Sequence, residues 1–241
     1  MLARILAVGL LAGLIGGLAL TAMQFWKVVP LIAAAEIYEE AAAEHHHDAA
    51  TAAHAHDAAW EPAPGLQRIS LTFLANLIIA IGFGLVLSGG FALRQALGGP
   101  SIGAGEGLLW GLAGFAAFAL APALGLPPEP PGMISADIVA RQSWWLATAL
   151  ATCGGIALIA LARRWPLWAL GIVLLLLPHL IGAPARPEGH DAVPASIAAE
   201  FVAASLVTSA VFWIVLGTSA GWLNAALALR GGLRHTARSV I

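Results

Sequence analysis

The chain has 241 residues, of which 60% are hydrophobic and only 10% are charged. Soluble domains carry about 25% charged residues, so this composition argues against a soluble protein and favours an integral membrane protein. The formal net charge is −2, and the single cysteine, Cys153, excludes an internal disulfide bond and a metal site built from several thiolates.

Long apolar runs predict membrane-spanning helices, each of which needs about 20 mostly apolar residues. About six runs satisfy this condition; they lie at 5–29, 69–93, 106–126, 144–162, 166–183 and 199–223. We predict that the first is a retained helix rather than a cleaved signal peptide, because no small-residue cleavage site follows it. Pro122 interrupts the third run and the fifth run is short, which leaves five spans as the alternative.

The charges between these runs predict the topology, because basic residues favour the cytoplasmic side of a membrane. If the N-terminus is cytoplasmic, the inner side holds more basic residues than the outer side, and the acidic residues gather outside. The inner set is Arg4, Arg94, Arg163, Arg164, Arg230, Arg234 and Arg238, and the outer set is Lys27, Arg68, Arg141 and Arg186. We therefore expect an all-α polytopic membrane protein, a single integral membrane domain over 1–241, with three helical hairpins and both termini cytoplasmic.

Glycines recur every four residues in two of the predicted spans, at Gly9, Gly13 and Gly17 and at Gly107 and Gly111. Small residues at this spacing let helix backbones approach closely in lipid. The pattern predicts helix-packing faces, and a glycine-lined pore is the alternative.

The longest outer loop, 30–68, begins with Pro30, a favourable first helical residue. The Ala- and Glu-rich sequence after it predicts that the first helix continues or restarts above the membrane. On such a helix Glu36, Glu40 and Glu44 stack on one face, where their repulsion would be relieved by a bound cation. A solvated acidic face is the alternative.

A histidine-rich tract, "HHHDAATAAHAHD", follows the acidic segment. Its candidate metal ligands are His45, His46, His47, Asp48, His54, His56 and Asp57. Neutral imidazole suits Co²⁺, Ni²⁺ and Zn²⁺, and carboxylates add charge. Since protons compete for imidazole, capture should weaken below about pH 6. The tract therefore predicts a flexible scavenging site, with a pH sensor or a tract without a role as alternatives.

His179 lies at the outer end of the fifth run, directly after Pro178. An ionisable residue at membrane depth is a functional candidate, and the proline frees a backbone carbonyl nearby. An interfacial histidine bonded to a neighbouring helix is the alternative. His190, with Asp191 and Glu200 near it, would extend the same outer ligand set.

Away from the ends of the predicted spans, the polar residues are uncharged, and they include Thr148 and Thr152. Met23, Gln24 and Asn76 are candidates for lining a path, and interhelical hydrogen bonding is the alternative. Asp137 and Arg141, four residues apart, predict an ion pair at the start of a helix.

Enzyme signatures are absent from the sequence. It contains no G-x-x-x-x-G-K-[ST], H-E-x-x-H or G-x-S-x-G motif, and its single lysine is Lys27. We therefore expect no catalytic activity, no cofactor and no nucleotide hydrolysis.

Several stretches together resemble the CbtA family of predicted cobalt transporter subunits. The matching residues are Leu11-Ala12-Gly13-Leu14, Val28-Val29-Pro30-Leu31, Glu36, Tyr38, Trp60, Pro62, Gly65, Leu66, Arg68, Leu74-Ala75-Asn76, Pro131-Gly132, Asp137, Arg141-Gln142, Trp144-Trp145, Leu177-Pro178-His179 and Gly182-Ala183-Pro184. The resemblance implies cobalt uptake for cobalamin synthesis across the bacterial inner membrane. It also implies a partner, CbtB, a small protein with one span and its own histidines.

The residues leave two other functions open. One is a membrane-anchored metal receptor or sensor that conducts nothing, and the other is a structural subunit of a membrane complex. We expect the lipid bilayer and a divalent metal ion as partners and no nucleic acid. Ligand type does not distinguish Co²⁺ from Ni²⁺ or Zn²⁺.

Overall fold

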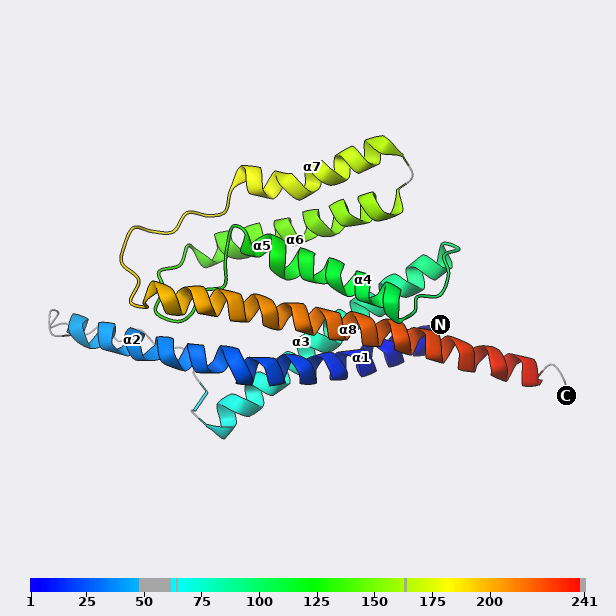
Figure 1. The fold of residues 1–241 in the computed structure, drawn as a ribbon, viewed down its shortest axis with the longest axis horizontal. Coiled ribbons are helices and arrows are strands. Elements are labelled where there is room, and N and C mark those ends of the chain that lie inside the picture. Colours follow the sequence, from blue (N-terminus) through cyan, green and yellow to red (C-terminus); the bar gives the residue numbers. More distant parts are fainter. Residues whose placement is uncertain (48–61, 64, 163, 239–241) are drawn as a thin grey trace. The chain divides into compact units, whose positions relative to one another are not determined.

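The computed structural model describes residues 1–47, 62–63, 65–162 and 164–238, and within them every regular element is a helix. The side chains of 43–47 and 230–238 lie outside the description. In chain order (Figure 1) the elements are α1 Leu2–Met23, η1 Gln24–Val28, α2 Val29–His47, α3 Leu66–Ala96, α4 Ala104–Phe115, η2 Ala116–Leu120, α5 Ala121–Ala123, α6 Ile138–Leu161, α7 Trp165–Ile181 and α8 Ala195–Arg238.

Among the described residues, five helices are long and apolar enough to cross a membrane. They are Leu2–Ala42, Leu66–Ala96, Ala104–Ala123, Ile138–Leu161 and Ala195–Leu229. These helices confirm the predicted all-α polytopic membrane fold. The sixth apolar helix, α7, has 17 residues and a rise of about 25 Å. It is short because Pro166 stands in its first turn and Gly182, with φ of 89°, ends it.

Two short π-helices interrupt the α-helical hydrogen bonding, and each stands just before a proline. η1 precedes Pro30 and η2 precedes Pro122. In each case the residue after the π-helix donates its N–H to the carbonyl five residues earlier. Proline offers no N–H to the carbonyl four residues back and its ring collides with that carbonyl, so the wider turn relieves the conflict.

The helices therefore run through both prolines. The first helix continues unbroken from Leu2 to Ala42, which confirms that it extends beyond the predicted span, with Pro30 inside it rather than at its start. The expectation that Pro122 interrupts the third span needs correction, because that helix persists to Ala123.

The chain forms two compact units. The first unit comprises Met1–Ala22, Pro62–Ala113 and Thr208–Ile241, and the second comprises Met23–Glu61 and Gly114–Val207. Each unit has its own helix contacts, which explain where its polar groups lie.

In the first unit, glycines bring helix backbones together. A Cβ atom on Gly13 of α1 would lie 2.5 Å from the Cα of Ile81 in α3. A Cβ atom on Gly217 of α8 would lie 2.7 Å from the Cα of Gly111 in α4. Real Cβ atoms do not approach other atoms so closely, so only glycine allows these contacts. The predicted helix-packing faces are confirmed.

In the second unit, α6 and α7 lie side by side as a hairpin (Figure 1). A Cβ atom on Gly155 of α6 would lie 2.7 Å from the carbonyl oxygen of Gly171 in α7. Nearer the other end of the pair, the Nε1–H of Trp144 donates to the Pro178 carbonyl at 3.3 Å. These two contacts fix the register of α6 against α7.

Candidate functional site

The acidic face of α2 leads directly to the histidine tract. α2 ends at His47, so Glu36, Glu40 and Glu44 follow one another turn by turn on a helix. Glu36 is half-buried and makes a contact within the protein, and Glu40 is exposed. The side chain of Glu44 lies outside the description.

The histidine tract itself falls beyond the described side chains. The backbone of His45, His46 and His47 closes α2, whereas Asp48, His54, His56 and Asp57 lie outside the described residues altogether. Among the described residues, no three His, Cys, Asp or Glu side chains form a group that could hold a metal ion. The proposed capture site therefore stays a prediction from the sequence.

His179 lies in the last turn of α7 and is half-buried. Its ring packs edge-on against the indole of Trp144, with 6.0 Å between the ring centroids. Neither ring nitrogen of His179 makes a hydrogen bond within the part of the chain that the structure describes. A neutral imidazole held by an aromatic neighbour and without a protein partner has a lone pair for a metal ion.

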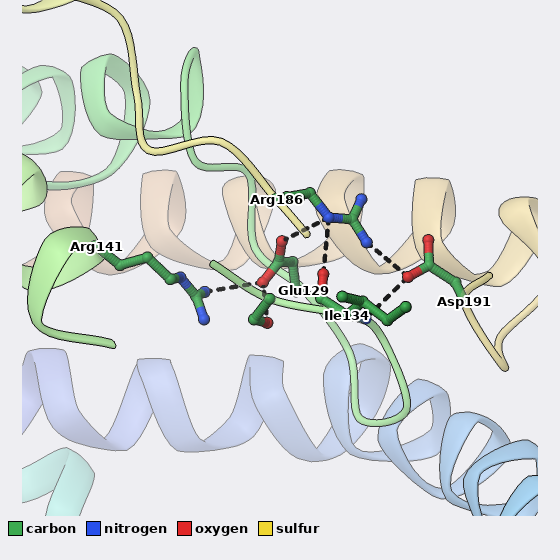
Figure 2. A network of polar contacts seen from close by, with 6 residues as sticks. Glu129, Ile134, Arg141, Arg186 and Asp191 are labelled. Atoms are coloured by element: carbon green, nitrogen blue, oxygen red, sulfur yellow. Dashed lines mark hydrogen bonds and ion pairs between the residues drawn. The ribbon is translucent and has the colours of Figure 1, made fainter. Parts of the chain in front are cut away.

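An ion-pair network joins the loops on either side of the α6–α7 hairpin (Figure 2). The Glu129 side chain is only 9% exposed, and its carboxylate lies 2.9 Å from the guanidinium of Arg141 and 3.8 Å from that of Arg186. The hydroxyl of Ser135 also donates to this carboxylate, at 2.6 Å. Two arginines and a hydroxyl compensate the charge of Glu129, which suits a structural tie better than a metal ligand.

The same network occupies Asp191. Arg186 donates to its carboxylate at 2.6 Å, and the backbone N–H of Ile134 donates to it at 2.9 Å. The neighbouring His190 is exposed, and Glu200 is exposed at the start of α8. The structure therefore does not unite His190, Asp191 and His179 into one ligand set within the described residues.

The predicted ion pair between Asp137 and Arg141 is wrong. Asp137 is the N-cap of α6, and its carboxylate accepts a hydrogen bond from the N–H of Ala140 at 2.9 Å. Arg141 pairs instead with Glu129. An aspartate just before an apolar helix is a capping signal, but no local pattern announces a partner twelve residues upstream.

The candidate path residues lie in different surroundings. Asn76 is buried in α3, and its Nδ2–H donates to the hydroxyl of Thr21 at 3.1 Å, so it ties α1 to α3. Met23 ends α1 and Gln24 begins η1, and both are half-buried. The interhelical hydrogen bond is therefore present for Asn76.

The described helices define an all-α polytopic membrane protein. Residues 2–225 match the CbtA family, whose description is "probable cobalt transporter subunit". Because the match spans almost the whole sequence, the chain belongs to this family, and the resemblance noted in the sequence is confirmed. Comparisons with curated proteins and with solved structures gave no match.

Proposed function

We propose that this chain is the membrane-spanning subunit of a cobalt uptake system in the bacterial inner membrane and that it carries Co²⁺ inward. The observation that carries this proposal is the match of residues 2–225 to a family of cobalt transporter subunits. The five long apolar helices among the described residues suit such a subunit. The proposal assigns no catalytic residue and no resident cofactor to the chain.

In the proposed capture step, the segment from Glu36 to Asp57 collects the cation outside the membrane. Glu36 and Glu40 stand one turn apart on α2, and the histidine tract follows without a break. Imidazoles and carboxylates on a long tract raise the local metal concentration without fixing one geometry, so capture is broad among Co²⁺, Ni²⁺ and Zn²⁺.

In the proposed transfer step, His179 receives the cation at the outer end of α7. Support comes from its half-buried position against Trp144 and its unengaged ring nitrogens within the described residues. One imidazole offers a single ligand, so it holds the ion briefly rather than tightly, as passage requires.

The membrane potential supplies the driving force. Moving one charge inward across 100 mV yields about 2.3 kcal/mol, so a divalent ion gains about 4.6 kcal/mol, which is about 2,000-fold accumulation at equilibrium. The main obstacle is dehydration of the ion, because no acidic residue lies in the middle of a described span.

A partner subunit is part of the proposal. The family description names a subunit, and without an acidic residue in the middle of a described span the dehydration of the ion is incompletely compensated. A small, single-span, histidine-bearing protein of the CbtB type would add ligands from outside this chain.

A metal receptor that conducts nothing is the second candidate. It is favoured by the lack of an acidic residue in the middle of the described spans. It predicts metal binding without accumulation in cells.

Cellular cobalt content, measured by mass spectrometry in a strain without other cobalt importers, tests the proposal. The chain is expressed with its small partner, and a variant carries Ala at His45, His46, His47, His54 and His56. Transport predicts cobalt above the empty-vector control, lost in the variant at low external cobalt and recovered at high cobalt. Binding without any cobalt rise would support the receptor instead.

A further inference from the structure

Hydroxyl groups in the described helices usually satisfy themselves within their own helix. The hydroxyls of Thr21, Thr72 and Ser143 each donate to the carbonyl one turn earlier, at 2.8, 2.8 and 2.7 Å. This local bond is the ordinary solution for a hydroxyl in an apolar helix, where water is absent.

Thr148 and Thr152 of α6 do not follow this pattern. Thr148 is 0% exposed and Thr152 is 3% exposed, and within the described residues neither hydroxyl oxygen has a hydrogen-bond partner. Thr208, in the first unit, shares this property. Buried polar groups nearly always have a partner, so an exception calls for a bound water molecule or ion.

The two threonines lie on the face of α6 that meets α7. Trp144, Thr148, Thr152 and Gly155 follow at intervals of four, four and three residues, which keeps them on one side of a helix. Trp144 bonds to Pro178 and Gly155 packs on Gly171, so both ends of this row contact α7. The threonines therefore lie between these two contacts.

The facing segment of α7 supplies a further oxygen. Pro178 stands inside α7 and has no N–H to donate to the carbonyl of Leu174, four residues earlier. Leu174 lies between Gly171 and Pro178, which are the residues that contact Gly155 and Trp144. The α6–α7 interface thus combines two unpartnered hydroxyls with a carbonyl that lacks its usual helical donor, and His179 stands at its outer end.

We infer that Thr148 and Thr152, with the Leu174 carbonyl, line the path of a divalent cation between α6 and α7, inward from His179. This inference rests on the proposed transport function and names the intramembrane part of its route. Neutral oxygens replace water around a cation without binding it so strongly that it stays. Both threonines are closed off from the surface here, so passage requires α6 and α7 to separate.

The chemistry of these ligands predicts their role in selectivity. Hydroxyl and carbonyl oxygens suit divalent cations in general, whereas imidazole favours Co²⁺, Ni²⁺ and Zn²⁺. The threonines therefore set the rate of passage, and the histidines select these transition metals over Mg²⁺ and Ca²⁺. Loss of the two hydroxyls should lower the uptake rates of Co²⁺ and Ni²⁺ by the same factor.

The first test removes the two threonine hydroxyls and keeps side chains of nearly the same shape. Thr148→Val and Thr152→Val are combined in the full chain expressed with its partner, and Ser143→Ala is the matched control, because that hydroxyl on the same helix is already bonded. The initial rate of cobalt uptake should fall about tenfold or more in the double variant, with an unchanged melting temperature, and Thr148→Ser with Thr152→Ser should restore it. A rate within about twofold of the wild type would overturn the inference.

The second test does not depend on transport. In a Cys153→Ala background, the test compares Thr148→Cys and Thr152→Cys with Leu150→Cys, whose exposed position lies on the opposite side of α6. A water-soluble methanethiosulfonate reagent should label positions 148 and 152 and leave 150 untouched, because lipid and not water surrounds that face. If none of the three positions is labelled, the proposed path is wrong. This result holds even if the valine variant fails to fold.

These outcomes separate the two proposals. If the valine variant takes up cobalt at the wild-type rate and cysteines at positions 148 and 152 are not labelled, the proposed path is wrong and the transport function still holds. Labelled threonines in a chain that accumulates no cobalt defeat the transport function instead.

Discussion

Arg186 donates its Nε–H to the carbonyl of Ile134 at 2.7 Å, so the loop after α7 is tied to the loop before α6. The ion pair between Arg186 and Glu129 joins the same two loops (Figure 2). Loops that touch lie on one side of a membrane. Since α6 is long enough to cross, α7 must return the chain to the side from which α6 started, although it has only 17 residues.

Together with the other long apolar helices, this relationship predicts an even number of crossings and both termini on one side, and the charge distribution predicts that this side is the cytoplasm. Reporter enzymes active only inside or only outside the cell, fused at the C-terminal end and inserted at Glu188, measure both positions. We expect a cytoplasmic C-terminus and an outer loop at 182–194. An outer C-terminus, with the Glu188 reporter inside, would show that α7 does not cross.

Loss of the Glu129 charge should loosen the loops before α6 and after α7. Glu129→Gln leaves Arg141 and Arg186 facing an uncharged amide, and their partial exposure, 27% and 41%, moderates the cost. We expect a loss of about 1–3 kcal/mol in the free energy of unfolding, measured by thermal unfolding in detergent. Glu188→Gln, on the exposed loop, is the control and should change stability by less than about 0.5 kcal/mol. Equal stability of the two variants would contradict the structural tie.

Asp137 should stabilise the protein by capping α6 and not by forming an ion pair. Asp137→Ala removes the acceptor for the Ala140 N–H and should cost about 0.5–2 kcal/mol of stability. Asp137→Asn keeps an acceptor at the same place and should retain most of it. If the asparagine variant were as unstable as the alanine variant, an ion pair rather than a cap would be indicated. Thermal unfolding of both variants decides between these.

Neighbouring glycines of α6 should respond differently to the same substitution. A Cβ on Gly155 meets the Gly171 carbonyl at 2.7 Å, whereas a Cβ on Gly154 meets its nearest neighbour, Leu174, at 3.5 Å, an ordinary contact. Gly155→Ala should therefore lose about 1–3 kcal/mol through forced separation of the helices. Gly154→Ala should be neutral or slightly stabilising, because alanine favours helix. Equal effects on the melting temperature would contradict the described α6–α7 register.

Features encoded by local pattern could be predicted from the sequence. Long apolar runs predict helices because few other structures can satisfy the backbone hydrogen bonds inside a bilayer. The spacing of Gly9 and Gly13 predicts close packing of helices. The sequence indicated Pro30 as the start of a helix and Pro122 as an interruption, and it did not indicate the π-helices that precede them. Whether a helix breaks at a proline or widens by one residue depends on its packing, which the sequence does not display.

Long-range features of the candidate site could not be predicted. Glu129 and Arg141 meet across a proline-rich loop, and the sequence offered Asp137 as a nearer partner for the arginine. Thr148 and Thr152 read as mild polar residues, because an unpartnered hydroxyl is recognised only when every neighbour is known. His179 stood out at once, since an ionisable side chain near an apolar run is rare.

Cobalt flux into sealed vesicles would show whether this chain and its partner carry Co²⁺ across a membrane. The full chain is reconstituted with its small partner, an inside-negative potential is imposed, and internal Co²⁺ is followed with a trapped metal-sensitive dye. We expect uptake that rises with the potential, is absent from protein-free vesicles and falls in the His179→Ala variant. No flux at any potential, with cobalt bound only to the outer surface, would contradict transport and identify the chain as a receptor.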